Sequence, residues 1–494
     1  MARVPVVKLS NDTRDITRDS LVSMRSPDKP AMDFSLEFDP ELLRRYDQVG
    51  PRYTSYPTAA QFVDEIEPAD YQQWVMRSNE DPIPRPLSLY FHIPFCATVC
   101  FYCACNKVVT KNRSRAVPYL AHLQQEIEMH SRLYDHDRKV EQLHWGGGTP
   151  TFLNAEQMAS LMQATARHFP LRNDDGGEYS LEIDPRTVDA GAIAMLRQLG
   201  FNRISLGVQD FNPKVQKAVN RIQSVAQTME IIEASRAAQF KSINIDLIYG
   251  LPFQTTATFS ATLDQIIGVA PNRLAIYNYA HLPDRFPPQR RIDPKDLPSP
   301  NEKLDILQLA IQKLTSAGYR YIGMDHFAKP DDELSVAQDA GTLQRNFQGY
   351  SSHAECDMIA MGVSSIGKVS DNFYQNTKDL EAYGTEIEAG RLPIVRGIEL
   401  EPDDLLRSSI ISQLMCNFAV DIPELERRWH FSFWSHLAPE RKELEAMEAD
   451  GLLRQSDDTV KILPAGRLLV RNICMVFDRY LRKESGKGIY SRVI

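Results

Sequence analysis

The chain has 494 residues, of which 43% are hydrophobic, and a formal net charge of −9. This length is enough for roughly two to four domains with a large buried core. The acidic balance disfavours a general nucleic-acid binder, and no nucleic-acid partner is expected. The sequence contains no apolar run of about eighteen residues and no charged-then-apolar leader, so it predicts neither a membrane span nor a secretory signal.

The first 35 residues differ in composition from the rest. They mix Asp, Ser, Arg and Pro with little periodicity, which is typical of a flexible extension. Their many aspartates argue against a transit peptide. The seven cysteines, four of them in one cluster, do not resemble a disulfide framework. We therefore expect a cytoplasmic protein in a reducing compartment.

From residue 87, strand-like runs alternate with amphipathic helices. Asn154 and Gln157 predict a capping box at the start of one helix, and another is expected to begin at Asp189 and end at Gly200. The alternation predicts an α/β fold of parallel βαβ units, a partial TIM-like (β/α)6 barrel, within residues 87–400. The predicted strands are Leu87–Ile93, Val140–Trp145, Tyr179–Ile183, Arg203–Val208, Ile243–Ile248 and Leu274–Tyr279.

Four cysteines follow the first predicted strand, in the run Cys96-Ala-Thr-Val-Cys100-Phe-Tyr-Cys103-Ala-Cys105. Three thiolates at these spacings can bind three irons of a cubic iron–sulfur cluster and leave the fourth iron open. Ferredoxins use two residues between their first three cysteines, and zinc sites usually come as two separated pairs, so neither pattern fits. The C-x3-C-x-aromatic-C arrangement resembles the radical S-adenosylmethionine signature, in which the open iron binds that cofactor. A zinc knuckle or chance clustering is the alternative.

Polar residues also stand at the carboxyl ends of the other predicted strands, where barrel enzymes hold their catalytic groups. The second strand runs into Gly146-Gly147-Gly148-Thr149, and the remaining strands end with or contain Glu182, Gln209, Asp246 and His281. The glycine run lacks the spacing of dinucleotide and triphosphate loops. Its bare backbone suits close approach by a small zwitterion. The alternative for Glu182 and Asp246 is a barrel-interior acid paired with a lysine or arginine.

Residues 401–494 predict a mainly helical, winged-helix-like domain. A strand pair is expected near Asp457–Leu463, followed by one long amphipathic helix over Ala465–Leu481. Because the chain lacks a basic stripe, we expect this domain to pack over the barrel opening rather than to bind DNA. Residues 36–86 are expected to cover the barrel mouth.

Several longer motifs extend these patterns. They are Pro51-Arg-Tyr-Thr-Ser-Tyr-Pro-Thr58, His92–Cys96 through Lys107, His144-Trp-Gly-Gly-Gly-Thr-Pro150, Gly207–Phe211, Asn244–Gly250, Tyr277-Asn-Tyr-Ala-His281, Gly323-Met-Asp-His-Phe327, Asn346-Phe-Gln-Gly-Tyr350 and Ser491–Ile494. On these residues, the chain from about Arg52 to Ile494 resembles the oxygen-independent coproporphyrinogen III oxidases (coproporphyrinogen dehydrogenases), radical S-adenosylmethionine oxidoreductases of haem biosynthesis. It departs from them in a longer N-terminus and in Tyr102, where a Phe is familiar.

The resemblance implies a [4Fe-4S] cluster held by Cys96, Cys100 and Cys103, with Cys105 not a ligand. It also implies two S-adenosylmethionine molecules per active site. The molecule on the cluster is expected to contact Tyr90, Gly147 and Glu182. The remaining contacts are expected from Tyr102, Gly148, Thr149, Gln209, Arg221, Asp246, Ala280 and Ile366.

The implied reaction is the oxidative decarboxylation of two propionate side chains of coproporphyrinogen III to vinyl groups, which gives protoporphyrinogen IX. A 5′-deoxyadenosyl radical from S-adenosylmethionine would abstract the hydrogen. A low-potential donor such as flavodoxin or ferredoxin and a monomeric state are also implied. The alternative is a haem chaperone of the same superfamily that carries haem without oxidising a porphyrinogen.

The substrate carries four carboxylates on an apolar macrocycle, so its pocket needs cations among aromatic side chains. Arg52, Tyr53 and Tyr56 are hypothesised to form a lid that binds a propionate, with Lys107 and Lys111 as further candidates. The alternative is that Pro51–Thr58 only anchors the N-terminal segment on the barrel.

Overall fold

The computed structural model describes residues 35–353, 356–483 and 490. Met1–Ser35 and Leu36–Ile494 form separate units, and the fold concerns the second. Apart from Ser35, the predicted flexible extension lies outside the described residues. Within the described part of the chain, no helix is both long and apolar enough to cross a membrane.

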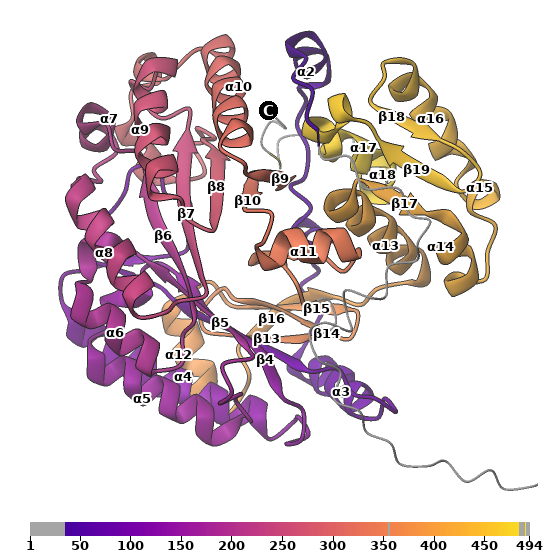
Figure 1. The fold of residues 1–494 in the computed structure, drawn as a ribbon. Coiled ribbons are helices and arrows are strands. Elements are labelled where there is room, and N and C mark those ends of the chain that lie inside the picture. Colours follow the sequence, from indigo (N-terminus) through magenta and orange to yellow (C-terminus); the bar gives the residue numbers. More distant parts are fainter. Residues whose placement is uncertain (1–34, 354–355, 484–489, 491–494) are drawn as a thin grey trace, which may run out of the picture. The chain divides into compact units, whose positions relative to one another are not determined.

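Six parallel strands form the centre of the main sheet in chain order, as the sequence predicts (Figure 1). They are β1 (Leu87–Ile93), β4 (Val140–Gly147), β5 (Glu178–Ile183), β6 (Arg203–Gln209), β7 (Ser242–Tyr249) and β8 (Arg273–Asn278). Most residues of these strands are buried, as expected for parallel strands covered on both faces. The partial α/β barrel is therefore confirmed.

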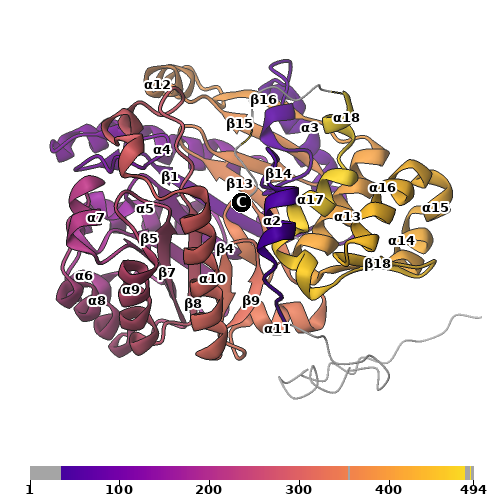
Figure 2. The ribbon, with the colours of Figure 1, turned by 90° about the horizontal axis from the view of Figure 1, so that it is seen from above.

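Helices connect these strands and pack along one side of the sheet (Figure 2). The two predicted helix caps are confirmed: Asn154 and Gln157 form a reciprocal capping box, and the Asp189 side chain accepts from the Ala192 amide. Gly200, at φ +100°, follows the end of the second helix. The helices are α4 (Ala116–Ser131), α5 (Ala155–His168), α6 (Ala190–Gln198), α7 (Pro213–Ala218), α8 (Val225–Ala237), α9 (Thr256–Val269) and α10 (Pro300–Ser316).

The sheet continues beyond the six repeats on both sides, in the order β16-β15-β14-β13-β1-β4-β5-β6-β7-β8-β10-β9. Strand β13 pairs in parallel with β1, and its Asp357 lies opposite Leu87. The added strands are β9 (Arg320–Gly323), β10 (His326–Ala328), β13 (Asp357–Met361), β14 (Ile366–Val369), β15 (Asn372–Asn376) and β16 (Ile394–Ile398). They place later parts of the chain on both sides of the predicted repeats.

Other short elements complete the region before residue 400. Strands β2 (Phe95–Cys96) and β3 (Val108–Val109) pair in parallel, and β11 (Gln344–Asn346) pairs antiparallel with β12 (Gly349–Ser351). Helix α11 (Glu333–Ala340) precedes β11, and α12 (Leu380–Glu388) precedes β16.

The C-terminal region combines helices with a small antiparallel sheet of order β17-β19-β18, which agrees with the winged-helix-like prediction. Its strands are β17 (Ala419–Asp421), β18 (Leu453–Gln455) and β19 (Thr459–Ile462). Its helices before residue 460 are α13 (Pro402–Asn417), α14 (Ile422–Trp429), α15 (Phe433–His436) and α16 (Ala438–Ala449).

The prediction of one long helix over Ala465–Leu481 is wrong. This stretch forms a 3-10 helix (Pro464–Leu469) and two short helices, α17 (Val470–Val476) and α18 (Arg479–Lys483). The buried Asp478 explains the second break, because its carboxylate accepts hydrogen bonds from the Tyr480 amide at 2.9 Å and the Tyr53 hydroxyl at 2.9 Å. A side chain that caps a new helix competes with continuation of the preceding one.

The segment before β1 packs on both the barrel and the C-terminal region. It contains α2 (Pro40–Tyr46) and α3 (Pro68–Asn79). Both ribbon views place α2 between α10 and α17 (Figures 1 and 2). The Arg471 Nε donates to the Pro51 carbonyl at 2.8 Å, and Val63 bridges to Gly397 of β16. Leu36–Ile494 is a single unit, so the boundaries near residues 86 and 400 stay predictions.

Candidate active site

The cysteines lie on one loop whose two ends are joined by backbone hydrogen bonds. Strands β2 and β3 pair at the two ends of this loop, and the Thr110 amide donates to the Cys96 carbonyl at 2.9 Å. Inside the loop, the Cys103 amide donates to the Cys100 carbonyl at 3.2 Å. Cys100 is buried, Cys96 and Cys103 are half-buried, and Cys105 is exposed. Three thiols are therefore presented together by a short, closed stretch of backbone.

The pKa values of Cys96, Cys103 and Cys105 are shifted in different directions. A hydrogen bond with Cys105, together with the positive charge of Lys107, lowers the pKa of Cys103 to about 6 although burial opposes the shift. The same contact raises the pKa of Cys105 well above its ordinary value. Burial raises the pKa of Cys96 to about 11, but a bound metal deprotonates a thiol outright. Cys105 therefore acts as a donor to Cys103.

Two arginines lie beside Cys100. The Nη1 of Arg221 is 3.5 Å from the Cys100 Sγ, and the Nη2 of Arg186 is 3.8 Å from it. Both guanidinium groups also pair with Asp184, at 3.2 Å and 2.6 Å. Arg221 is buried. Their positive charge offsets the negative charge of a metal cluster bound at these cysteines.

The glycine-rich turn is docked directly on the cysteine loop. The Gly148 amide donates to the Ile93 carbonyl at 2.8 Å, and the Thr149 amide donates to the Phe95 carbonyl at 2.9 Å. The Thr149 Oγ1 is 3.5 Å from the Cys96 Sγ. A Cβ on Gly148 would lie 2.7 Å from the backbone carbon of Pro94. Only glycine allows the turn to come this close to the backbone of the cysteine loop. The close contact places backbone polar groups of the turn next to the cysteines.

Glu182 is held at the other side of the same turn. Its Oε2 accepts from the Gly147 amide at 3.1 Å, and its Oε1 lies 3.5 Å from the His144 Nε2. Burial would raise the pKa of Glu182, but His144 and the Gly147 amide lower it below its ordinary value. The Tyr90 ring stacks on His144 with centroids 5.8 Å apart. Glu182 is thus a carboxylate fixed against the glycine turn by its backbone.

Asp246 and Gln209 provide buried polar groups deeper in the barrel. Asp246 accepts from Ser205 at 2.9 Å and from Asn244 at 2.8 Å, and burial raises its pKa to about 6. Gln209 has a φ of +69°, and among the described residues its buried Oε1 has no hydrogen-bond partner. Buried polar atoms are normally paired, so these side chains suit a polar ligand.

Three other predicted residues lie around this core. Tyr102 packs on an apolar cluster that includes Leu251, and its carbonyl accepts from Gln289 at 3.1 Å. Ala280 follows β8 and lines a cavity. Ile366 begins β14, in an apolar cluster with Phe373. The structure thus brings the cysteine loop, glycine turn, Glu182 and Arg221 together, while Ile366 stands on β14, on the other side of β1 from Glu182.

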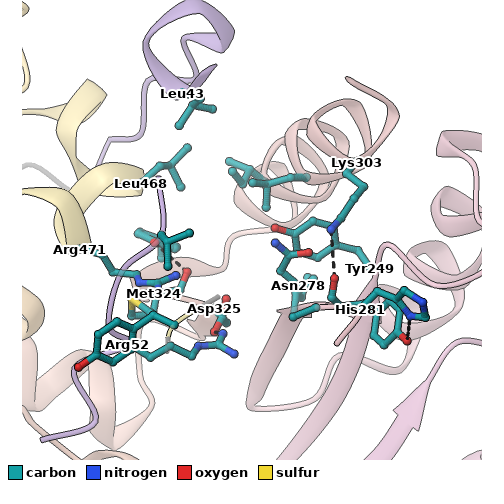
Figure 3. Close-up of a pocket in the computed structure, with 18 of the residues that line it drawn as sticks. Leu43, Arg52, Tyr249, Asn278, His281, Lys303, Met324, Asp325, Leu468 and Arg471 are labelled. Carbon is teal, nitrogen blue, oxygen red and sulfur yellow. Dashed lines mark hydrogen bonds and ion pairs between the residues drawn. The ribbon is translucent and has the colours of Figure 1, made fainter. Parts of the chain in front are cut away.

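A cavity of about 360 Å³ opens between the barrel and the C-terminal region. Figure 3 shows Leu468 and Arg471 on one wall and Asn278, Lys303 and Tyr249 on the other. Arg52 lines the cavity and pairs with Asp325, with an Nη2–Oδ2 distance of 2.5 Å. Asp325 and Arg471 had no role in the sequence-based prediction. The sequence feature that points to Asp325 as a functional residue is its position in the Gly323–Phe327 motif.

The other proposed substrate residues point elsewhere. Tyr53 and Tyr56 are buried; the Tyr53 hydroxyl donates to Asp478, and the Tyr56 hydroxyl accepts from the Arg479 amide at 3.1 Å. Both therefore anchor the segment on the C-terminal region. Lys107 donates to the carbonyls of Cys103 and Cys105, and Lys111 is exposed on the same loop. Of these candidates, Arg52 alone lines the cavity.

The residues present fit an iron–sulfur cluster and a small polar cofactor. Across residues 35–353, 356–483 and 490, no three Cys, His, Asp or Glu side chains converge on the position of one metal ion. Three cysteines that each bind a different iron do not need to converge in this way. The glycine turn lies directly beside the cysteine loop, and the unpaired Gln209 Oε1 supplies a polar group deeper in the barrel.

Comparison with known proteins agrees with this geometry. Residues 90–266 match the Radical SAM superfamily, and residues 400–469 match the HemN C-terminal domain. The chain is 52% identical to an oxygen-independent coproporphyrinogen III oxidase of Pseudomonas aeruginosa over 93% of its own length and 99% of the relative's. The chain belongs to the oxygen-independent coproporphyrinogen III oxidase family.

Two further relatives support the assignment. An Escherichia coli K12 protein of the same name is 46% identical, with 93% of this chain and 99% of the relative covered. The solved structure described as "Coproporphyrinogen III oxidase (HemN) from Escherichia coli is a Radical SAM enzyme" superposes with a TM-score of 0.86 at 44% identity, covering 90% of this chain and 100% of that one. As a member of this family, the protein is an oxidoreductase that uses a [4Fe-4S] cluster and S-adenosylmethionine.

Proposed function

We propose that this protein converts coproporphyrinogen III to protoporphyrinogen IX by oxidative decarboxylation of two propionate side chains. The observation that carries this proposal is the 52% identity to a coproporphyrinogen III oxidase over 93% of the chain. The cysteine loop docked on a bare glycine turn supports it. In each half-reaction, a propionate loses one hydrogen atom, one electron and carbon dioxide, and a vinyl group remains.

In this proposal, Cys96, Cys100 and Cys103 hold the cluster. When bound, the cluster and S-adenosylmethionine supply the electron and the 5′-deoxyadenosyl group that takes hydrogen from the substrate. Arg221 and Arg186 balance negative charge beside Cys100. The buried barrel interior excludes water from the reacting carbon.

We assign the amino and carboxylate groups of the first S-adenosylmethionine to the Gly147 backbone and Glu182, with Tyr90 behind them. Glu182 suits an ammonium group because its pKa is lowered and it is therefore ionised at neutral pH. A second S-adenosylmethionine is part of the proposal. Its contacts would come from Tyr102, Gly148, Thr149, Gln209, Arg221, Asp246, Ala280 and Ile366.

A low-potential flavodoxin or ferredoxin is proposed as the electron donor to a monomeric enzyme. Cys105 is exposed on the cluster loop, and Lys111, Arg113 and Arg115 follow it on the surface. The sequence from Pro82 to Gln125 contains no Asp or Glu, although the whole chain has a net charge of −9. A basic surface beside the cluster loop suits an acidic donor protein.

The test is anaerobic incubation of the reconstituted protein with coproporphyrinogen III, S-adenosylmethionine and a reductant. Protoporphyrinogen IX, carbon dioxide, methionine and 5′-deoxyadenosine are the expected products. The Cys96→Ala variant is the matched control and should form none of them. Stoichiometric haem binding without decarboxylation by the wild-type protein would replace this proposal with the haem-chaperone alternative.

A further inference from the structure

Arg345 lies in strand β11 with most of its guanidinium group unsatisfied. Its Nε and Nη1 are buried and, among the described residues, have no hydrogen-bond partner. Its Cζ lies 4.8 Å from the centroid of the Tyr350 ring. The Tyr350 hydroxyl donates to the Met415 carbonyl at 3.0 Å, which fixes the ring under the guanidinium. Burying a charged guanidinium group costs free energy unless an anion accepts hydrogen bonds from its N–H groups.

Two further arginines share its surroundings, with one acid. Arg52 pairs with Asp325, and Arg471 donates to the Gly50 and Pro51 carbonyls. Burial lowers the pKa of Arg471 to about 10, and the positive charges of Arg52 and Arg345 add to this shift although Asp325 opposes it. The same two arginines help burial to lower the pKa of His326 to about 3. The group therefore carries surplus positive charge.

This positive region borders the candidate cofactor site through Tyr277. Burial raises the pKa of Tyr277 well above its ordinary value; the negative charges of Asp246 and Asp325 add to this shift, and Arg345 and Arg52 oppose it. The Tyr277 and His326 rings meet edge to face with centroids 6.0 Å apart, and His326 meets Tyr350 in the same way at 5.3 Å. Arg52, Asp325 and Arg471 also line the cavity shown in Figure 3. An anion held here would lie between the cavity and the cofactor residues.

We propose that Arg345, together with Arg52 and Arg471, forms a carboxylate-binding subsite for the propionates that the reaction retains. The inference rests on the proposed function, because it takes the substrate to be a porphyrinogen with four propionates. Guanidinium groups bind carboxylates through paired, charge-assisted hydrogen bonds. The surrounding tyrosines offer apolar ring faces to a macrocycle.

The assignment to retained propionates follows from the chemistry. A salt bridge stabilises the carboxylate anion, whereas each reacting propionate must lose its carboxylate as carbon dioxide. Strong pairing with arginines would oppose that loss. A propionate that stays in the product, by contrast, can remain paired through both half-reactions and orient the macrocycle for each.

The test is fluorescence titration of the cluster-loaded protein with two stable probes, coproporphyrin III and protoporphyrin IX. The second probe keeps only the retained propionates. We expect Arg345→Met to raise the Kd for both probes by about 10- to 100-fold, which is the range for losing a charge-assisted hydrogen bond. The tetramethyl ester of coproporphyrin III should bind wild type and variant equally. Arg391→Met is the matched control, since Arg391 is an exposed arginine paired with Glu386.

The outcomes separate the two proposals. A wild-type protein that binds neither free acid, and forms no product, contradicts the proposed function itself. Wild-type affinity of the Arg345→Met variant for both acids overturns the subsite, and weakening for coproporphyrin III alone overturns its assignment to retained propionates. If the Arg345→Met variant does not fold, the Arg345→Lys variant tests the subsite in its place. We expect Arg345→Lys to lower the affinity for both free acids by about threefold or more, because an ammonium group cannot form two parallel hydrogen bonds with a carboxylate. Unchanged affinity overturns the subsite.

Discussion

Replacing Gly148 by alanine should disturb the contact between the glycine turn and the cysteine loop. The new Cβ would lie 2.7 Å from the Pro94 carbonyl carbon, 2.8 Å from its oxygen and 3.0 Å from the Ile93 oxygen. All three are backbone atoms, so no side chain can rotate away. Relief requires the turn to move away from Ile93 and Pro94 at the end of β1, which stretches the Gly148–Ile93 hydrogen bond of 2.8 Å. Overpacking of this kind costs about 1–3 kcal/mol.

The assay has two parts. Denaturant unfolding of the cluster-free protein should show the loss of about 1–3 kcal/mol, and titration of the reconstituted protein should show weaker S-adenosylmethionine binding. Gly268→Ala is the control, because Gly268 lies in α9 with nothing within 4 Å of a new Cβ. It should stabilise the protein by about 0.4–1 kcal/mol. A Gly148→Ala protein with wild-type stability and wild-type cofactor affinity would refute the reasoning.

Three further predictions concern the candidate site. Because burial raises the pKa of Asp246 from its ordinary 3.8 to about 6, the folded state binds more protons than the unfolded chain between these values, and stability from this group is lost as the pH rises through that window. Asp246→Asn should therefore raise the thermal stability of the cofactor-free protein at pH 7.5 and weaken S-adenosylmethionine binding; a destabilised variant contradicts this. Cys105→Ser should keep the iron content of wild type after anaerobic reconstitution, whereas Cys96→Ser should lose it. Equal iron loss in the two would make Cys105 a ligand. Arg52→Ala should raise the KM for coproporphyrinogen III with the cluster spectrum and S-adenosylmethionine affinity unchanged, and an unchanged KM would remove Arg52 from substrate binding.

The central strands were predictable because each has its own local signal. A buried apolar run such as Leu87–Ile93 needs only its neighbours in sequence to be recognised, and caps such as Asn154 act within one turn. The pairing of β13 with β1 joins residues about 270 positions apart, and no local pattern contains that information. The long C-terminal helix failed for a partly related reason, because Asp478, whose carboxylate caps the Tyr480 amide at the second break, is also held by a hydrogen bond from the distant Tyr53.

The candidate site likewise contains residues that local sequence predicts and residues that only the fold brings together. The cysteines and the glycine turn are each a contiguous motif, so their spacing alone indicates their chemistry. Asp325, Arg345 and Arg471 come from three separate segments, and their shared charge appears only when the chain is folded. Gly323–Phe327 and Asn346–Tyr350 were recognised as motifs, but nothing local connects the first with Arg471.

The main sheet begins with β16 and ends with β9, so its two edge strands do not pair with each other. None of its twelve strands comes from the C-terminal region, whose strands β17, β18 and β19 form a separate sheet, so the backbone ladder that carries the cofactor loops does not include the C-terminal helices. Insertions or exchanges in the C-terminal helices can reshape the space offered to a bulky reactant without breaking a ladder bond near the cysteines. Such an architecture allows substrate preference to diverge while the radical-generating machinery stays the same.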